Sequence, residues 1–279
     1  MSDGTLSDAR GVLMELRQAL GTHATPGGEV QLRCDGPVAQ LVLNHGARRN
    51  ALTVGMMIDL AEHVMTLSAW EGSLVFLRAA EPRVFCAGGD LTELPHAPAD
   101  AAGAMCRAMG TVLDGLLDLP AVSVCLLDGL AVGGGAELTT ACDHRLGTPA
   151  ARVHFVQAQL GIAPGWGGAG RLVRHVGRRH ALRILTRGSP VDVDEGVGLG
   201  LFDALLELAA GEDALAAGAR WAEPLLALPS AAVQAVKRQV VAAAPARRGL
   251  LDEEARAFEG VWGGPDHQEA LTRLARHRS

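Results

Sequence analysis

Several residue types are scarce in this chain of 279 residues, and each shortage narrows the class of protein. There is no tyrosine, and aromatic residues make up only 3% of the sequence. Lysine occurs once, at Lys237, and acidic residues outnumber basic ones by 31 to 25, which gives a formal net charge of −6. A chain without excess positive charge does not attract nucleic acid or an anionic membrane surface. We therefore expect neither of these as a partner.

Long hydrophobic runs and paired cysteines are also missing. No apolar stretch approaches the roughly 18 residues that a membrane-spanning helix needs. The five cysteines are odd in number and include no CxxC pair, so we expect free thiols in a reducing compartment. Asp3, Asp8 and Glu15 interrupt the N-terminal region, which lacks the basic and then apolar pattern of a secretory signal. These features predict a cytoplasmic protein, and the histidines show no metal-ligand spacing.

The remaining composition, 48% hydrophobic and 20% charged, is typical of a globular protein with a large core. Apolar strands alternate with amphipathic helices from residue 29 onward. This alternation predicts an α/β fold with a largely parallel sheet. We expect an N-terminal helical extension at 1–28, a core at 29–200 and a C-terminal helical region at 201–279. The expected strands are 29–44 (a hairpin), 73–77, 121–127 and 153–156, and the expected helices are 8–20, 53–68, 99–117, 169–176, 178–186, 192–199, 211–227, 230–243 and 250–258.

Two glycine-rich turns follow apolar strands and precede helices. The first is FCAGGDL (85–91), and the second, with Gly133, Gly134 and Gly135, leads into a helix that opens at 136–138. Glycine allows the backbone to approach a ligand closely, and a helix N-terminus presents free N–H groups. Such turns bind a phosphate or a developing oxyanion, and two of them can direct two N–H groups at one oxygen. Glu137 then lies beside the ligand, either as an acid/base or as a carboxylate stabilised by the helix dipole.

Four motifs in register resemble those of a known family: LNHGARRNAL (43–52), FCAGGDL (85–91), DGLAVGGGAELTTACDHRL (128–146) and LGIAPGWGGAGRL (160–172). From about residue 29 to its end, the chain resembles the crotonase (enoyl-CoA hydratase/isomerase) superfamily. The resemblance implies a spiral of ββα units with a C-terminal helical region that packs in trimers, often as dimers of trimers. It also implies an acyl-CoA thioester as the substrate, with coenzyme A as part of that substrate and no other cofactor. A thioester on an acyl carrier protein is the alternative.

The resemblance also implies roles for individual residues. The backbone N–H groups of Ala87 and Gly134 would form the oxyanion hole for the thioester carbonyl. Each such donor contributes a few kcal/mol to stabilising an enolate. The implied substrate-binding residues are Arg49, Ala51, Ala87, Gly88, Gly89, Asp90, Leu91, Gly134 and Trp166. Structural roles compete at some positions: capping or an arginine pair for Asp90 and Asp143, core packing for Trp166 and Trp262, and a structural or exposed position for His144.

One position departs from the hydratase pattern. Hydratases of this family orient a water molecule with two glutamates, of which the first corresponds to Glu137. Alignment from the turn at Gly161 places Gln157 at the second position. An amide does not accept or deliver a proton near neutral pH as a carboxylate does. We therefore expect this chain to be a poor hydratase, with Glu137 and Gln157 as its candidate catalytic side chains.

Within the superfamily, the closer resemblance is to the ethylmalonyl-CoA decarboxylase branch. It rests on GGGAELTTACDHRL (133–146), VHFVQAQLGIAPGWGG (153–168) and VWGGP (261–265), although that branch has histidine where this chain has Gln157. Loss of CO2 creates an enolate without a base. The resemblance thus implies a carboxy-lyase for a short branched malonyl thioester, such as ethylmalonyl- or methylmalonyl-CoA. The alternatives are a hydratase/isomerase that uses Glu137 as its single acid/base, and a non-catalytic acyl-CoA- or RNA-binding relative.

Overall fold

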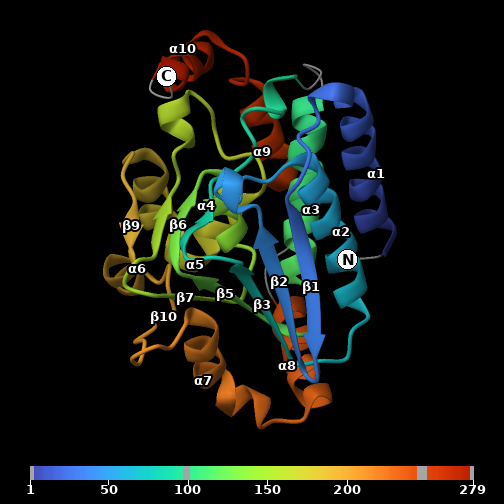
Figure 1. Ribbon diagram of the computed structural model, residues 1–279, viewed down its shortest axis with the longest axis vertical. Coiled ribbons are helices and arrows are strands. Elements are labelled where there is room, and N and C mark those ends of the chain that lie inside the picture. Colours follow the sequence, from blue (N-terminus) through green and yellow to red (C-terminus); the bar gives the residue numbers. More distant parts are fainter. Residues whose placement is uncertain (1–2, 97–100, 244–249, 277–279) are drawn as a thin grey trace.

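Two sheets of mostly parallel strands form the centre of the computed structural model, which describes residues 3–96, 101–243 and 250–276 (Figure 1). The first sheet has the strand order β1 (Glu29–Asp35), β2 (Val38–Asn44), β3 (Leu74–Ala79), β5 (Val122–Leu127), β7 (His144–Gly147) and β10 (Ala204–Leu205). The second sheet has the order β4 (Arg83–Cys86), β6 (Gly129–Val132), β8 (Arg152–His154) and β9 (Val191–Asp192).

From β3 to β8, successive strands alternate between the two sheets, so that the pairs β3 and β4, β5 and β6, and β7 and β8 each contribute one strand to each sheet. Among the described strand pairs, only the hairpin β1–β2 and the pair β8–β9 are antiparallel. This arrangement is the predicted spiral of strand pairs and helices, and the predicted α/β class is confirmed. The helices are α1 (Asp3–Leu20), α2 (Val54–Ser68), α3 (Ala101–Leu117), α4 (Gly134–Thr139), α5 (Gly168–Thr186), α6 (Val193–Leu199), α7 (Ala214–Leu226), α8 (Ser230–Ala243), α9 (Leu250–Glu259) and α10 (Pro265–Arg276).

Most of the long elements lie where the sequence predicts them, and the differences are local. The predicted helices 169–176 and 178–186 form one helix, α5, which Gly177 interrupts with a non-helical backbone (φ 72°, ψ 161°). The predicted strand 153–156 is β8, which ends at His154. The first two residues of the predicted helix 99–117 lie outside the described residues. The strands β4, β6, β7, β9 and β10 were not predicted, because segments of two to four residues show no clear periodicity. The helix α10, with 12 residues, was not predicted either.

The alternation of side chains along β3 explains how both faces of the first sheet are covered. Val75 and Leu77 point into the main core, which α1, α2 and α3 complete, whereas Leu74 and Phe76 point into a second cluster under α7. A strand covered on both faces has a continuous apolar sequence, as SLVFL does. Among the described helices, none is long and apolar enough to cross a membrane.

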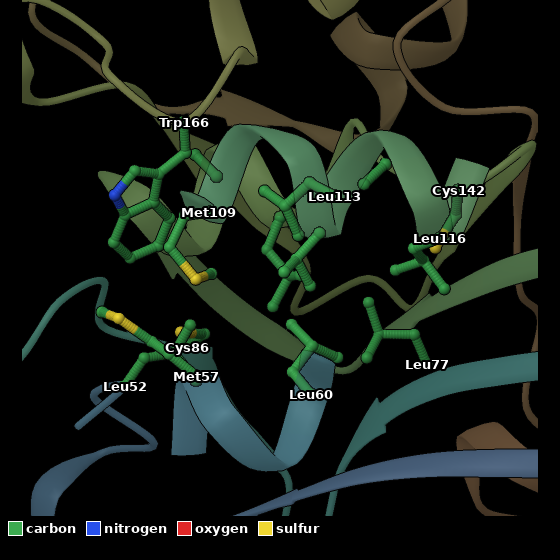
Figure 2. Packing of buried hydrophobic residues seen from close by; sticks show 14 of the residues in the cluster. Leu52, Met57, Leu60, Leu77, Cys86, Met109, Leu113, Leu116, Cys142 and Trp166 are labelled. Atoms are coloured by element: carbon green, nitrogen blue, oxygen red, sulfur yellow. The ribbon is translucent and has the colours of Figure 1, made fainter. Parts of the chain in front are cut away.

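The main core extends to the glycine-rich turns. Figure 2 shows Met57 and Leu60 of α2 facing Leu113 and Leu116 of α3, with Cys86 and Trp166 at one end of the same cluster. All five cysteines are free thiols, and all except Cys34 are buried. The division at residues 28 and 200 stays a prediction; α1 packs on α2 and α3, and β10 pairs with β7.

Candidate active site

The two glycine-rich turns meet at the ends of neighbouring parallel strands. The strands β4 and β6 pair in parallel, so the turns that follow Cys86 and Val132 leave the same edge of the second sheet. A methyl group on Gly88 would lie 3.0 Å from the Val132 carbonyl oxygen and 3.2 Å from the Gly134 nitrogen. Gly88 also has a φ of +93°, which favours glycine. The sequence-predicted pair of turns is therefore brought together at Gly88 and Gly134.

The two predicted oxyanion donors differ in their present partners. Gly134 is the first residue of α4, and the first intrahelical bond runs from the Glu137 N–H to the Gly133 carbonyl at 3.0 Å. The Gly134 N–H therefore precedes the intrahelical bonds and is available to a ligand. The Ala87 N–H donates to the Arg49 carbonyl oxygen at 3.1 Å. Both N–H groups can bind one thioester oxygen only if the Ala87 N–H breaks its hydrogen bond to the Arg49 carbonyl oxygen, or divides it between that oxygen and the thioester oxygen.

Glu137 is buried at the wall of the site and accepts four hydrogen bonds. Its Oε2 accepts from the N–H groups of Trp166 (2.8 Å) and Gly168 (3.0 Å). Its Oε1 accepts from Gln157 Nε2 (2.9 Å) and, more weakly, from the Gly165 N–H (3.4 Å). Burial raises the pKa of Glu137 above its ordinary value, although these N–H groups and the nearby Arg171 guanidinium offset part of that effect.

Gln157 forms one unit with Glu137, as the alignment of the two positions implies. It begins the 3₁₀ helix Gln157–Leu160 and is only 5% exposed. Its amide nitrogen donates to Glu137, whereas its amide oxygen is buried and has no hydrogen-bond partner among the residues that the structure describes. An unpaired buried acceptor is costly, so this oxygen marks a place for a ligand or water.

A cavity of about 90 Å³ lies in front of these groups. Its polar side chains are Glu137, Gln157 and the two indoles, and no arginine, lysine or histidine is among the described residues that line it. The glycine-rich turns form one wall, through Ala87, Gly88, Gly89, Gly133 and Gly134. The apolar wall comprises Leu91, Leu94, Met105, Val156, Leu160, Ile162, Ala163, Trp166, Phe258 and Trp262. Among the residues that the structure describes, a carboxylate in this cavity would therefore meet no cation.

Trp166 has both of the roles that the sequence left open. Its ring lines the cavity, and it is 5% exposed within the main core. A methyl group on Gly134 would overlap this ring, so glycine at that position is required by packing as well as by ligand approach. Trp262 lines the cavity too, next to Phe258, with ring centroids 4.9 Å apart.

Three of the predicted substrate-binding residues do not line the cavity: Arg49, Ala51 and Asp90. The Arg49 side chain is exposed, and Ala51 is 9% exposed at the end of the same loop. Asp90 is buried; its Oδ1 accepts from the Thr92 N–H (2.8 Å) and hydroxyl (2.7 Å), with Arg48 Nη1 at 3.6 Å. Asp90 therefore stabilises a turn and pairs with an arginine, in line with the structural roles that competed with ligand contact.

Sequence reasoning missed the charged groups behind Glu137. Arg171, 2% exposed, donates to Asp114 Oδ1 at 3.0 Å, to Thr140 Oγ1 at 3.0 Å and to the Trp166 carbonyl. Glu254 on α9 accepts from the Gly170 N–H at 2.6 Å. Burial, together with the Glu137 charge, raises the pKa of Glu254 to about 7. Arg171 lies within the motif LGIAPGWGGAGRL (160–172), but the sequence does not show its partners, which come from elements far apart in the chain.

Replacing Asp114 by alanine is expected to lower the free energy of unfolding by about 3–5 kcal/mol, because the Arg171 guanidinium would stay buried without its carboxylate partner. Urea denaturation measures the loss. The exposed pair Arg10–Glu62 provides the control, since Glu62→Ala should cost less than about 1 kcal/mol. Equal midpoints for the two variants would contradict this account of the Arg171 pair.

Solved structures establish the class of fold. An enoyl-CoA hydratase from Mycobacterium avium subsp. paratuberculosis superposes with a TM-score of 0.77 at 21% identity, over 89% of this chain and 99% of that one. An enoyl-CoA hydratase/isomerase from Pseudoalteromonas atlantica gives a TM-score of 0.77 at 20% identity, over 90% and 98% of the two chains. At this identity the likeness shows the fold alone, which this chain shares with these enoyl-CoA hydratases and hydratase/isomerases.

The family follows from sequence. The model of the enoyl-CoA hydratase/isomerase family matches residues 33–278, so the chain belongs to this family, as its motifs predict. The ethylmalonyl-CoA decarboxylase of Danio rerio is 42% identical over 269 residues, which cover 91% of this chain and 86% of that protein. The ethylmalonyl-CoA decarboxylase of Homo sapiens is 35% identical over 256 residues, which cover 89% and 82%.

Proposed function

We propose that this protein is an acyl-CoA decarboxylase for a short branched malonyl thioester, of the ethylmalonyl-CoA or methylmalonyl-CoA type. The main support is the cavity itself, which pairs Glu137 with an amide, Gln157, and has no cation among its described lining residues to meet a substrate carboxylate. The similarity to ethylmalonyl-CoA decarboxylases at 35–42% identity supports the same reaction.

The proposed chemistry uses the groups at the two turns. The bond between the α carbon and the carboxylate breaks, CO2 leaves, and the electron pair passes into the thioester as an enolate. A cavity without a cation solvates the carboxylate poorly, which favours its loss. The N–H groups of Gly134 and, once Arg49 releases it, Ala87 stabilise the enolate oxygen. A proton then adds to the α carbon, and Glu137, whose pKa burial raises, is the candidate donor.

The second candidate is a hydratase or isomerase with Glu137 as its only acid/base. All four hydrogen-bonding sites of the Glu137 carboxylate are already occupied, which weakens it as a base for water. Two assays separate the candidates: CO2 release from ethylmalonyl-CoA, and loss of the crotonyl-CoA absorbance on hydration. We expect the first activity to dominate. Hydration at ordinary hydratase rates without CO2 release would overturn the proposal, and neither activity would favour a non-catalytic acyl-CoA-binding protein.

The remaining expectations belong to this proposal. Coenzyme A enters as part of the substrate, and a carrier-protein thioester is the alternative donor of the acyl group. The stretch with Arg49 and Ala51 would lie along the coenzyme A, outside the acyl cavity. We place the protein in the cytoplasm.

We also propose a homotrimer or a dimer of trimers. The apolar residues of α7, of the loop after it and of α8 divide into two groups. Leu225, Leu226 and Val233 face the chain's own interior, whereas Leu228, Val236 and Val240 are 56%, 60% and 64% exposed. Val236 and Val240 lie one turn apart on α8, and exposed aliphatic side chains on one helix face are typical of a subunit interface. Sedimentation equilibrium at micromolar concentration should give three or six times the chain mass. A stable monomer would contradict the proposal.

A further inference from the structure

Glu137 and Gln157 form a buried hydrogen-bonded pair in which Gln157 is now the donor. Glu137 Oε1 accepts from Gln157 Nε2 at 2.9 Å, and the side chains are 3% and 5% exposed. We propose that the Gln157 amide turns over when Glu137 is protonated, and that binding of a malonyl thioester therefore takes up one proton at Glu137. The inference rests on the proposed function, because it requires a ligand that carries a carboxylate.

In its present orientation the Gln157 amide directs its NH2 group at Glu137 and cannot donate it to a carboxylate in the cavity. An ionised Glu137 only accepts hydrogen bonds, so Gln157 must present its NH2 group to it. The amide oxygen is then left buried without a partner among the described residues, in a side chain that lines the cavity. This oxygen is an acceptor, as the substrate carboxylate is. The two would repel each other, and a carboxylate needs a donor at that place.

The hydrogen bonds of Glu137 determine which of its oxygens can take a proton. Oε2 is held by two backbone N–H groups, from Trp166 at 2.8 Å and Gly168 at 3.0 Å, and a backbone N–H cannot become an acceptor. Oε1 is held by the Gln157 amide and, at 3.4 Å, by Gly165. Only the amide can reverse its role, by turning about its last side-chain bond. A proton on Oε1 would then be donated to the Gln157 oxygen, and the NH2 group would face the cavity.

The charges around Glu137 explain why Glu137 would take up a proton when a carboxylate binds in the cavity. The positive charge of Arg171 on α5 acts on Glu137, but Arg171 is paired with Asp114 on α3. Glu254 on α9 adds negative charge, and Cys106 on α3 is a buried thiol. A second carboxylate in a cavity whose described lining holds no cation therefore favours the neutral form of Glu137. Burial already raises the pKa of Glu137, in the same direction.

Titration calorimetry with two unreactive ligands tests the inference. One is a coenzyme A thioether that carries the branched carboxylate, and the other is the same thioether without the carboxylate. Binding enthalpies in buffers of different ionisation enthalpy, at a pH where free Glu137 is ionised, give the protons exchanged. We expect an uptake of about one proton for the first ligand and none for the second, with the Kd of the first rising up to about tenfold per pH unit.

Three variants identify the group that takes up the proton. Glu137→Gln should abolish the uptake. Glu254→Gln is the matched control and should keep the uptake, because Glu254 is a second carboxyl group near Glu137 whose pKa burial raises. Gln157→Leu should weaken the carboxylate ligand by at least about tenfold and leave the other ligand unchanged, since a charged ligand loses its donor. This third variant decides the matter if Glu137→Gln does not fold.

The outcomes separate this inference from the proposed function. No proton uptake by the wild-type protein, or uptake that survives Glu137→Gln or disappears in Glu254→Gln, would overturn the inference. Wild-type CO2 release is measured independently with the reactive substrate. Release without uptake would overturn the inference alone, whereas uptake without release from any malonyl thioester would overturn the proposed decarboxylation.

Discussion

Replacing Gln157 by glutamate is expected to lower decarboxylation by about 10³-fold and to raise crotonyl-CoA hydration from a low baseline. The new carboxylate would lie within hydrogen-bonding distance of Glu137, where the amide nitrogen now lies 2.9 Å away. It would also face the substrate carboxylate. Two like charges about 4 Å apart cost roughly 4 kcal/mol at an effective dielectric near 20, which is an upper figure if one of them takes up a proton.

A neutral control separates charge from shape at this position. Gln157→Met keeps the length of the side chain and adds no charge, so it should lose less decarboxylation than Gln157→Glu and gain no hydration. The kcat/KM values of all three proteins for ethylmalonyl-CoA and crotonyl-CoA decide the matter. Unchanged decarboxylation in the Gln157→Glu protein would show that this residue does not face the reacting carboxylate.

Replacing Gly88 by alanine is expected to lower kcat by about 10²–10³-fold, the loss typical of one oxyanion-hole donor. The added methyl group would lie 3.2 Å from the Gly134 nitrogen and would block its N–H from the thioester oxygen. Gly134 itself is a less suitable target, because any side chain there would overlap the Trp166 ring.

Gly27→Ala is the matched control for this substitution. Gly27 has a φ of +82°, close to the +93° of Gly88, but a methyl group there would meet nothing within 4 Å. Both variants therefore bear a similar backbone strain, and only Gly88→Ala affects the proposed donor. Steady-state kinetics with circular dichroism should show two folded proteins and one loss of activity. Equal activity of the two would mean that Gly134 does not stabilise the enolate.

Much of the site was predictable because its local signals are strong. The glycine-rich turns follow apolar strands. In a chain whose strands alternate with helices, such turns lie at the same edge of the parallel sheet. The structure brings Gly88 and Gly134 together there, with Glu137 and Gln157 beside them. The position of Gln157 followed from its distance to the Gly161 turn, which the motif fixes.

The partners of these residues were not predictable, because they come from elements far apart in the chain. The donors to Glu137 include Trp166 and Gly168, about 30 residues later, and only the packing of α5 on α4 places them. The bond from Ala87 to the Arg49 carbonyl depends on a loop in a left-handed conformation, with a φ of 55° at Arg49. Such tertiary hydrogen bonds leave no periodic trace in the sequence.

The partners of single charged residues were likewise not predictable from the sequence. Asp143 suggested an arginine pair or a cap, and its partner is Lys237, the one lysine of the chain, at 2.5 Å. His144 was expected to be structural or exposed, and it pairs with Asp203 at 2.8 Å. The residue type predicts that a charge needs a partner, whereas the fold decides which partner it meets.

The most direct measurement of the central claim follows the carboxylate carbon and the incoming proton in one reaction. Ethylmalonyl-CoA with a ¹³C-labelled carboxylate is incubated with the wild-type protein in deuterated water. The account predicts one labelled CO2 for each butyryl-CoA formed, and one deuterium at its α carbon, because loss of CO2 generates the enolate that a solvent-derived proton then quenches. The account would be contradicted if no labelled CO2 appeared while the same protein hydrated crotonyl-CoA at ordinary hydratase rates.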